Sequence, residues 1–208
     1  MNRSEDALQE SKTTKELDPL VEPPQDTLRF AESLGEDFNT VIAAAEAARD
    51  RHPEDPRYHI VLGLLCADAG RTADARREAE FSAGRVDNWS QWNRGLLWAR
   101  LGKPEEAQKL AAEWENAART EYISPLWMAS LYSELGENEL ALDWLERNHG
   151  EGAGALVLDF QFRTIDSIRR DPRFRSILER MKLPADVKRA QGGATGDRSI
   201  PAESGSKI

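Results

Sequence analysis

Histidines, a cysteine and paired carboxylates are the residues of this 208-residue chain that could carry chemistry. A metal site or an activated nucleophile would need them at defined spacings, with a second ligand or a base nearby. The histidines fall in different segments, and none has another histidine or a cysteine at metal-ligand spacing; they are His52, His59 and His149. We expect each to lie at a helix end or on a helix surface, in a solvated or capping role.

Three further features contain residue types that catalytic or phosphate-binding sites use. Cys66 is the single cysteine, and a packing role is favoured because a reactive thiolate would need a nearby base or positive field. Residues 150–155, GEGAGA, lack the lysine of a phosphate-binding loop and follow an expected helix, which favours a flexible hinge. Glu105 and Glu106 follow Pro104 at an expected helix start, where negative charge is favourable. We therefore expect no catalytic residue, no metal and no cofactor.

The composition limits the kinds of partner and the cellular compartment that we expect. The net charge is −9, whereas a nucleic-acid surface needs a clustered positive field, so no nucleic-acid partner is expected. A single cysteine excludes an intrachain disulfide and suits a reducing cytoplasm. The chain has no apolar run of the ~20 residues that a membrane helix needs, and no signal-peptide core at its start. These features predict a cytoplasmic protein with no membrane partner.

The elements that must position these residues are helices. Apolar residues recur at helical spacing, and no run of alternating β-branched residues indicates a strand. Four glycines lie between helical stretches at intervals of 35, 32 and 34 residues: Gly35, Gly70, Gly102 and Gly136. An interval of about 34 residues is typical of a helix–turn–helix solenoid unit.

Small residues surround the last three glycines in a repeated pattern. The seventh residue before each and the fifth after it are small, which predicts two closely packed helices: Gly63, Gly95 and Ala129 before, and Ala75, Ala107 and Ala141 after. The glycine itself can adopt the left-handed conformation that ends a helix. The fourth residue before each glycine is an expected core residue: Cys66, Trp98 or Tyr132.

This pattern resembles the tetratricopeptide repeat. Units at 56–87, 88–121 and 122–155 fit it, whereas 26–55 is degenerate, with Thr40 in place of the expected alanine. The C-terminal part, with "YISPLWMASLYSELGENELALDWLERN" and "DFQFRTIDSIRRDPRFRSILERMKLP", resembles the terminal repeat and end cap of bacterial multidomain regulators, kinases and cyclases. The resemblance implies an all-α, right-handed solenoid of helical hairpins with a C-terminal helical cap.

A cap over residues 156–184 is also expected on physical grounds, because the last helix pair of a solenoid needs cover for its apolar face. Asp171 followed by Pro172 is typical of a helix start. The next residues place an apolar stripe on one helix face: Phe174, Ile177, Leu178 and Met181. Residues 1–25 and 185–208 are polar, which predicts disorder.

Six tryptophans are the feature that bears most directly on binding. In the tetratricopeptide family one face of each first helix lines a concave groove. The resemblance therefore implies a peptide-binding groove of Ile60, Leu64, Trp89, Trp92, Asn93, Leu96, Leu126 and Trp127. Rings that line such a groove should be partly exposed, and the alternative is that they pack between repeats. Packing is expected for Trp98, Trp114 and Trp144.

Charge is uneven along the chain. From Arg163 to Arg189 there are nine Lys or Arg against four Asp or Glu, which gives +5 and leaves −14 for the remainder. These cations either decorate the outer face of the cap or dock an acidic partner, such as the acidic N-terminal segment of the chain.

The sequence thus predicts a non-catalytic adaptor or scaffold that binds a protein or peptide, with a homo-oligomer also possible. The alternative is a regulatory subunit of a separately encoded bacterial kinase, cyclase or transcriptional regulator. An enzyme would require at least two titratable groups with perturbed pKa values in one concave pocket.

Overall fold

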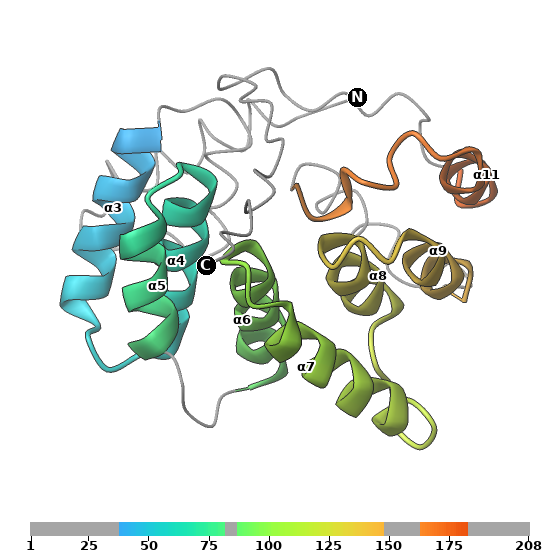
Figure 1. Ribbon diagram of the computed structural model, residues 1–208, viewed down its shortest axis with the longest axis horizontal. Coiled ribbons are helices and arrows are strands. Elements are labelled where there is room, and N and C mark those ends of the chain that lie inside the picture. The colour runs from blue at the N-terminus through green and yellow to red at the C-terminus, as the bar shows by residue number, and fades with distance from the viewer. Residues whose placement is uncertain (1–37, 82–86, 148–162, 183–208) are drawn as a thin grey trace, which may run out of the picture.

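The computed structural model describes residues 38–81, 87–147 and 163–182. Within these ranges the chain forms α-helices and a short 3-10 helix, and no strand. The helices follow one another across the molecule in sequence order (Figure 1). They are α3 (Phe38–Arg51), α4 (Pro56–Asp68), α5 (Thr72–Phe81), α6 (Asn88–Arg100), α7 (Pro104–Ala117), α8 (Pro125–Glu134), α9 (Asn138–Glu146), η1 (Arg163–Ile165) and α11 (Pro172–Arg180). The predicted all-α helical solenoid is confirmed.

Helices α4 to α9 pair into hairpins, α4 with α5, α6 with α7 and α8 with α9. The first helices α4, α6 and α8 also pack against one another, so that they form a continuous row along the solenoid. The alanines of the repeated pattern have no exposed surface: Ala75, Ala107, Ala129 and Ala141. Helix α3 packs on α4 at the place expected for the second helix of the predicted degenerate unit, and the expected first helix lies outside the described residues.

The turn inside each hairpin has the conformation that the glycine spacing predicts. Gly70, Gly102 and Gly136 have φ values of 78°, 75° and 79°. The N–H after each glycine donates to a carbonyl five residues back, as Arg71 N does to Cys66 O at 2.8 Å. This bond is typical of a Schellman ending. A Cβ at these glycines would meet nothing within 4 Å, so the glycine is needed for its backbone conformation and not for space.

The two glycines inside first helices are needed for space. A Cβ on Gly63 would lie 2.6 Å from Leu97 Cδ2, which belongs to the next repeat. A Cβ on Gly95 would lie 3.0 Å from Leu110 Cδ2 in its own hairpin and 3.1 Å from Leu131 Cδ1 in the next repeat. Small residues were expected to bring the two helices of one hairpin together, but they also set the approach of neighbouring repeats.

An ion-pair ladder crosses the repeats at the ends of the first helices. Arg100 Nη1 lies 2.9 Å from Asp68 Oδ2 on α4, and Arg100 Nε lies 2.7 Å from Glu134 Oε1 on α8. The three residues occupy the same place in successive repeats, two before the glycine of the turn. Only 7% of the Arg100 side chain is exposed, so the ladder is largely shielded from solvent.

The described part of the cap has the helix that the sequence predicts. Helix α11 starts at Pro172, and the Asp171 carboxylate accepts from Arg173 N at 2.8 Å. Its apolar stripe is turned inward: Phe174, Ile177 and Leu178 are buried and Met181 packs against the core. The segments predicted to be disordered, 1–25 and 185–208, lie outside the described residues, as does the predicted hinge at 150–155.

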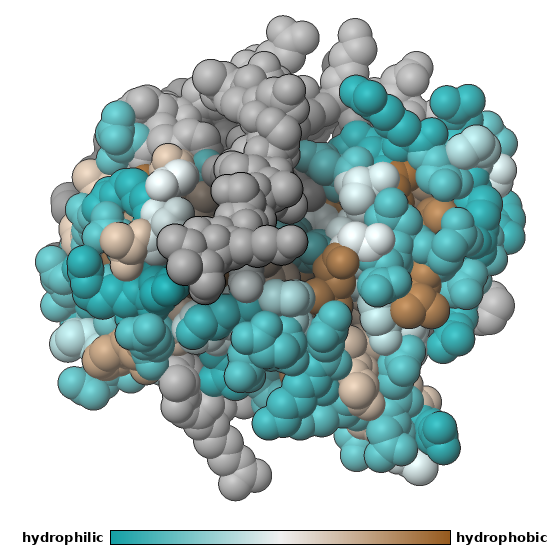
Figure 2. Space-filling view, viewed as in Figure 1, coloured by the Kyte–Doolittle hydropathy of each residue, from teal (hydrophilic) through white to brown (hydrophobic). Residues whose placement is uncertain are grey.

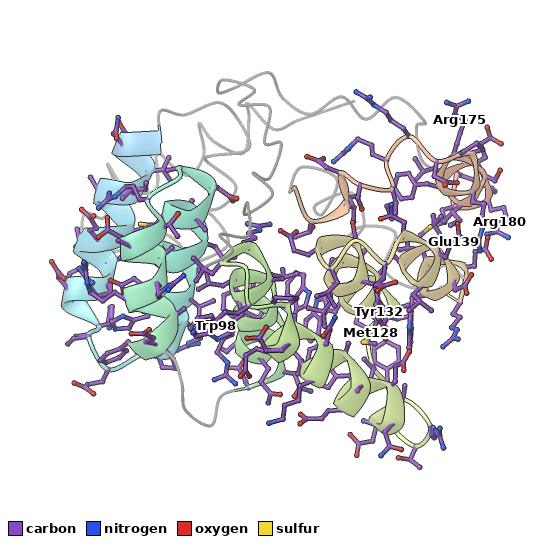
Figure 3. All side chains as sticks on the ribbon, viewed as in Figure 1. Trp98, Met128, Tyr132, Glu139, Arg175 and Arg180 are labelled. Atoms are coloured by element: carbon purple, nitrogen blue, oxygen red, sulfur yellow. The ribbon has the colours of Figure 1, made fainter. Side chains whose placement is uncertain are left out.

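The cations of the cap have two different environments. Arg173 contacts three carboxylates of α9, at 2.8 Å from Glu139 Oε2, 2.8 Å from Asp143 Oδ1 and 3.0 Å from Glu146 Oε2. Arg175 and Arg180, in contrast, are exposed and extend outward from α11 (Figure 3). Part of the positive charge of this segment therefore docks an acidic stripe of the chain itself, and part decorates the outer face.

Candidate functional site

Three indole rings from three different helices stack on one another. The ring of Trp127 on α8 lies 5.3 Å from that of Trp92 on α6, with an interplanar angle of 10°. It also lies 6.0 Å from the ring of Trp114 on α7, at 29°. Trp92 Nε1 donates to Ser130 Oγ at 2.9 Å, and Ser130 Oγ donates to the carbonyl of Trp127 at 3.0 Å. The stack is thus held in place by hydrogen bonds as well as by ring contacts.

A pocket of about 430 Å³ opens beside this stack. Its lining comes from the first residue of α6, the end of α7, the following loop and the start of α8: Asn88, Trp114, Tyr122, Ile123, Ser124 and Trp127. None of these side chains is charged. A hollow of this size lies in the range of ligand pockets, which are mostly apolar with a few polar groups.

The side chains around the pocket differ in exposure. Tyr122 is 72% exposed, the most exposed large hydrophobic residue of the described chain, whereas Trp114 is 6% exposed. Trp127 and Ile123 are half-buried and pack against the core. The face of the molecule drawn in Figure 2 is mostly hydrophilic, with small separate hydrophobic areas where α8 and α9 lie. The pocket therefore combines a rigid inner wall with an accessible outer ring.

The structure buries most of the predicted groove residues. Trp92 is 4% exposed, so its ring packs between repeats, which is the alternative to a partly exposed groove position; Trp127 stacks on it and Ser130 accepts its N–H. The other buried members of the predicted set are Ile60, Leu64, Asn93, Leu96 and Leu126. Trp89 and Trp127 are half-buried. Of the eight groove residues named above, Trp127 lines the pocket.

Asn93 has a local role in the described structure. It has no exposed surface, and its Nδ2 donates to the carbonyl of Trp89 one turn earlier at 3.0 Å. Its amide therefore supports the first turns of α6 from the inside.

Sequence reasoning missed four of the residues that line the pocket. Trp114 was expected to pack in the interior, and it does, but its ring also forms part of the pocket wall. Asn88, Tyr122 and Ser124 were not considered. For Tyr122 and Ser124 the available signal was their place in the connection between two hairpins, just before Pro125 at the start of a helix that carries Trp127.

The predicted packing of Trp144 is confirmed, whereas Trp98 is only partly buried. Trp144 is 5% exposed. Trp98 is half-buried, and Lys103 Nζ lies 4.5 Å from the centre of its ring. It lines a smaller hollow of about 90 Å³ between α6 and α7, together with Arg94.

His59 is not on the surface as predicted, since it is 5% exposed. Its Nδ1 lies 2.6 Å from Glu78 Oε2 and its Nε2 lies 2.8 Å from the carbonyl of Pro53. The other oxygen of Glu78 accepts from Arg49 Nη1 at 2.7 Å, so α3, α4 and α5 are joined by one buried network. The sequence did not reveal it because the three side chains come from three helices. His52 is exposed and stacks on Tyr58, and His149 lies outside the described residues.

The remaining candidates are a buried thiol and two exposed carboxylates. Cys66 is 1% exposed, and burial raises the pKa of its thiol to about 11, which confirms the packing role over a nucleophilic one. Glu105 and Glu106 are exposed in the first turn of α7. The described ranges contain no cluster of three or more His, Cys, Asp or Glu that could hold a metal ion. None of the helices described has the length and apolar character needed to cross a membrane.

Comparison with known proteins covers the first two hairpins. The tetratricopeptide repeat family matches residues 56–80 and 88–113, that is, α4 with α5 and α6 with most of α7. These two hairpins are therefore similar to tetratricopeptide repeats. The hairpin of α8 and α9 lies outside the matched residues and has the same turn geometry at Gly136. No curated protein and no solved structure matches the chain.

Proposed function

We propose that the protein is a non-catalytic adaptor that binds a segment of another protein at the pocket of Trp114, Tyr122, Ile123 and Trp127. Tetratricopeptide repeats generally mediate protein–protein interactions, which supports a protein partner. We choose this surface because of one observation: a mostly apolar pocket of about 430 Å³ is lined by Trp114 and Trp127, whose rings belong to the aromatic stack.

Rigidity supports a binding role for this pocket. An aromatic anchor that is already fixed loses little conformational freedom when a partner arrives, so less of the interaction energy is consumed by ordering. Trp127 is fixed by two neighbouring rings, and its own carbonyl accepts from Ser130. Tryptophan and tyrosine are also the residues most often found as binding hot spots.

The buried members of the predicted groove have a supporting role in this proposal. Trp92 lies behind Trp127 and holds its ring, while Leu96 and Leu126 are buried core residues on the same two helices. In this proposal Trp127 is the predicted groove residue that contacts the partner. The accessible surface lies beside the predicted groove, at the loop that carries Tyr122.

Peptide binding by the full-length chain tests the proposal. A surface-bound library of random peptides should retain the protein, and the best peptide should bind in solution by fluorescence anisotropy. Tyr122→Ala should weaken that binding by about tenfold or more, which is the loss typical of a hot-spot residue. Leu140→Ala, which removes another exposed apolar side chain on α9, is the matched control and should bind as the parent does.

Two results would contradict the proposal. Retention of no peptide at all would remove the binding function. Equal binding by the Tyr122 and Leu140 variants would place the partner on another surface.

A further inference from the structure

The pocket beside Trp127 has a lining without charge, and this neutrality selects its occupant. The six lining residues include two indoles, a phenol and an isoleucine, together with one amide and one hydroxyl. Nothing in that lining could pair with a carboxylate brought into the pocket, and burial of an unpaired negative charge is costly. A side chain without negative charge is therefore the complementary guest.

The aromatic rings in the pocket wall further restrict the type of side chain that would bind there. Aromatic pairs prefer offset-stacked or edge-to-face contacts and gain stability beyond their buried area. Trp114, Tyr122 and Trp127 offer such contacts from α7, the loop and α8. A flat aromatic side chain can use all three walls, whereas a branched aliphatic one gains only from its area.

The polar groups of the pocket match a peptide backbone. Asn88 is exposed at the start of α6, and its side chain has one amide donor group and one carbonyl acceptor. The Ser124 hydroxyl makes no capping hydrogen bond at the start of α8. In the described chain neither side chain has a hydrogen-bonding partner, so both can pair with the N–H and C=O groups that flank a guest side chain.

Building on the proposed function, we infer that the pocket takes one aromatic side chain from an extended, uncharged stretch of the partner, whose neighbouring peptide groups pair with Asn88 and Ser124. The occupant is thus specified as phenylalanine, tyrosine or tryptophan within a neutral segment. The wall residues recognise the ring, and the amide and hydroxyl recognise the backbone on either side of it.

A guest series in one short peptide tests this inference. The probes are blocked glycine–serine peptides with a single central guest, which is tryptophan, phenylalanine, leucine, alanine, arginine or glutamate. Each is titrated into the full-length chain while the indole N–H signals of the protein are followed by NMR. The aromatic guests should bind about tenfold or more tightly than alanine or glutamate, in keeping with a hot-spot contact, and should shift the signals of Trp114 and Trp127.

Two variants separate the wall from the backbone contacts. Tyr122→Ala removes a ring that is 72% exposed, so the fold should persist while the preference for an aromatic guest falls. Asn88→Asp keeps the size of the side chain and stays at a helix start, where a carboxylate is favoured. It removes the amide donor, so the uncharged guest peptides should bind several-fold more weakly and their order should not change.

Each other occupant predicts a different result. An arginine guest that binds best would make the pocket a cation site and overturn the inference. A dimer in sedimentation equilibrium that dissociates in Tyr122→Ala would make a second copy the occupant. Displacement of the guest by a synthetic peptide of residues 1–37 with higher affinity than any aromatic guest would assign the pocket to the chain itself.

The outcome also distinguishes this inference from the function on which it rests. Binding of random library peptides that depends on Tyr122 but shows no preference for aromatic guests would leave the adaptor function standing and refute the aromatic occupant. Failure of all library peptides would refute the adaptor function itself.

Discussion

Gly63 and Leu97 meet at the boundary between two repeats, where a Cβ on Gly63 would lie 2.6 Å from Leu97 Cδ2. Gly63→Ala should therefore overpack this boundary, because Leu97 has no exposed surface and little room to move. We expect a loss of ~1–3 kcal/mol in the free energy of unfolding, measured by urea titration.

A double variant identifies the cause of that loss. Gly63→Ala combined with Leu97→Val should lose less stability than the sum of the two single changes, because the shorter side chain makes room for the new methyl group. Strict additivity would show that the glycine is needed for another reason.

Trp92 should behave as a core residue. Trp92→Ala removes a ring that is 4% exposed and leaves Trp127 without its stacking partner, so we expect a loss of ~3–5 kcal/mol in stability. Ser130→Ala keeps the ring but leaves its buried N–H without an acceptor, and it should cost ~1–3 kcal/mol. Thermal melts of both variants provide the measurement. A Trp92→Ala protein with an unchanged melting temperature would reinstate the ring as an exposed groove residue.

Arg100 should be needed for the stability of the fold because it lies between two carboxylates. Arg100→Met leaves Asp68 and Glu134 with 11% and 16% of their side chains exposed and without this cation between them. We expect a loss of ~2 kcal/mol or more in the free energy of unfolding.

Two companion variants test that explanation. Arg71→Met removes a cation whose side chain is 40% exposed, and it should have a much smaller effect. The triple change Asp68→Asn, Arg100→Met, Glu134→Gln should recover part of the loss, since no uncompensated charge remains. A triple variant that is less stable than Arg100→Met alone would contradict the electrostatic explanation.

Alkaline pH should destabilise the fold through Cys66. Burial raises the pKa of this thiol from 9.0 to about 11, so between these values the unfolded chain loses a proton that the folded chain retains. The contribution is fully present below pH 9 and is lost as pH rises toward 11, by roughly 2 kcal/mol. Stability should be measured by urea titration across this interval, and Cys66→Ala should flatten the decline. Rapid reaction of the native thiol with a disulfide reagent at neutral pH would show that the residue is accessible.

Features that depend on a few neighbouring residues could be predicted from the sequence. The turn glycine needs only its own φ, and the start of α11 needs only Asp171 and the amide of Arg173. The alanines of the hairpins follow from a period of one repeat. Each of these follows from spacing along the chain, and each is present in the structure.

The side chains that meet across repeats could not be predicted in the same way. Glu78 contacts Arg49 and His59 across 29 and 19 residues, and Trp92 reaches Ser130 across 38. Helical periodicity tells which face of a helix is turned inward, but it does not tell which neighbour fills the space over a large ring. For this reason the sequence left Trp92 open between a groove position and packing between repeats.

The ladder of Asp68, Arg100 and Glu134 restricts how this chain could be rearranged. Its charges alternate from one hairpin to the next, so exchanging the first two hairpins would bring the two acidic residues side by side. A copy of the last hairpin inserted after itself would likewise place glutamate next to glutamate. Duplication of the last two hairpins as a block would preserve the alternation, so this solenoid can be lengthened by gene duplication or by design in steps of two repeats, but not in steps of one.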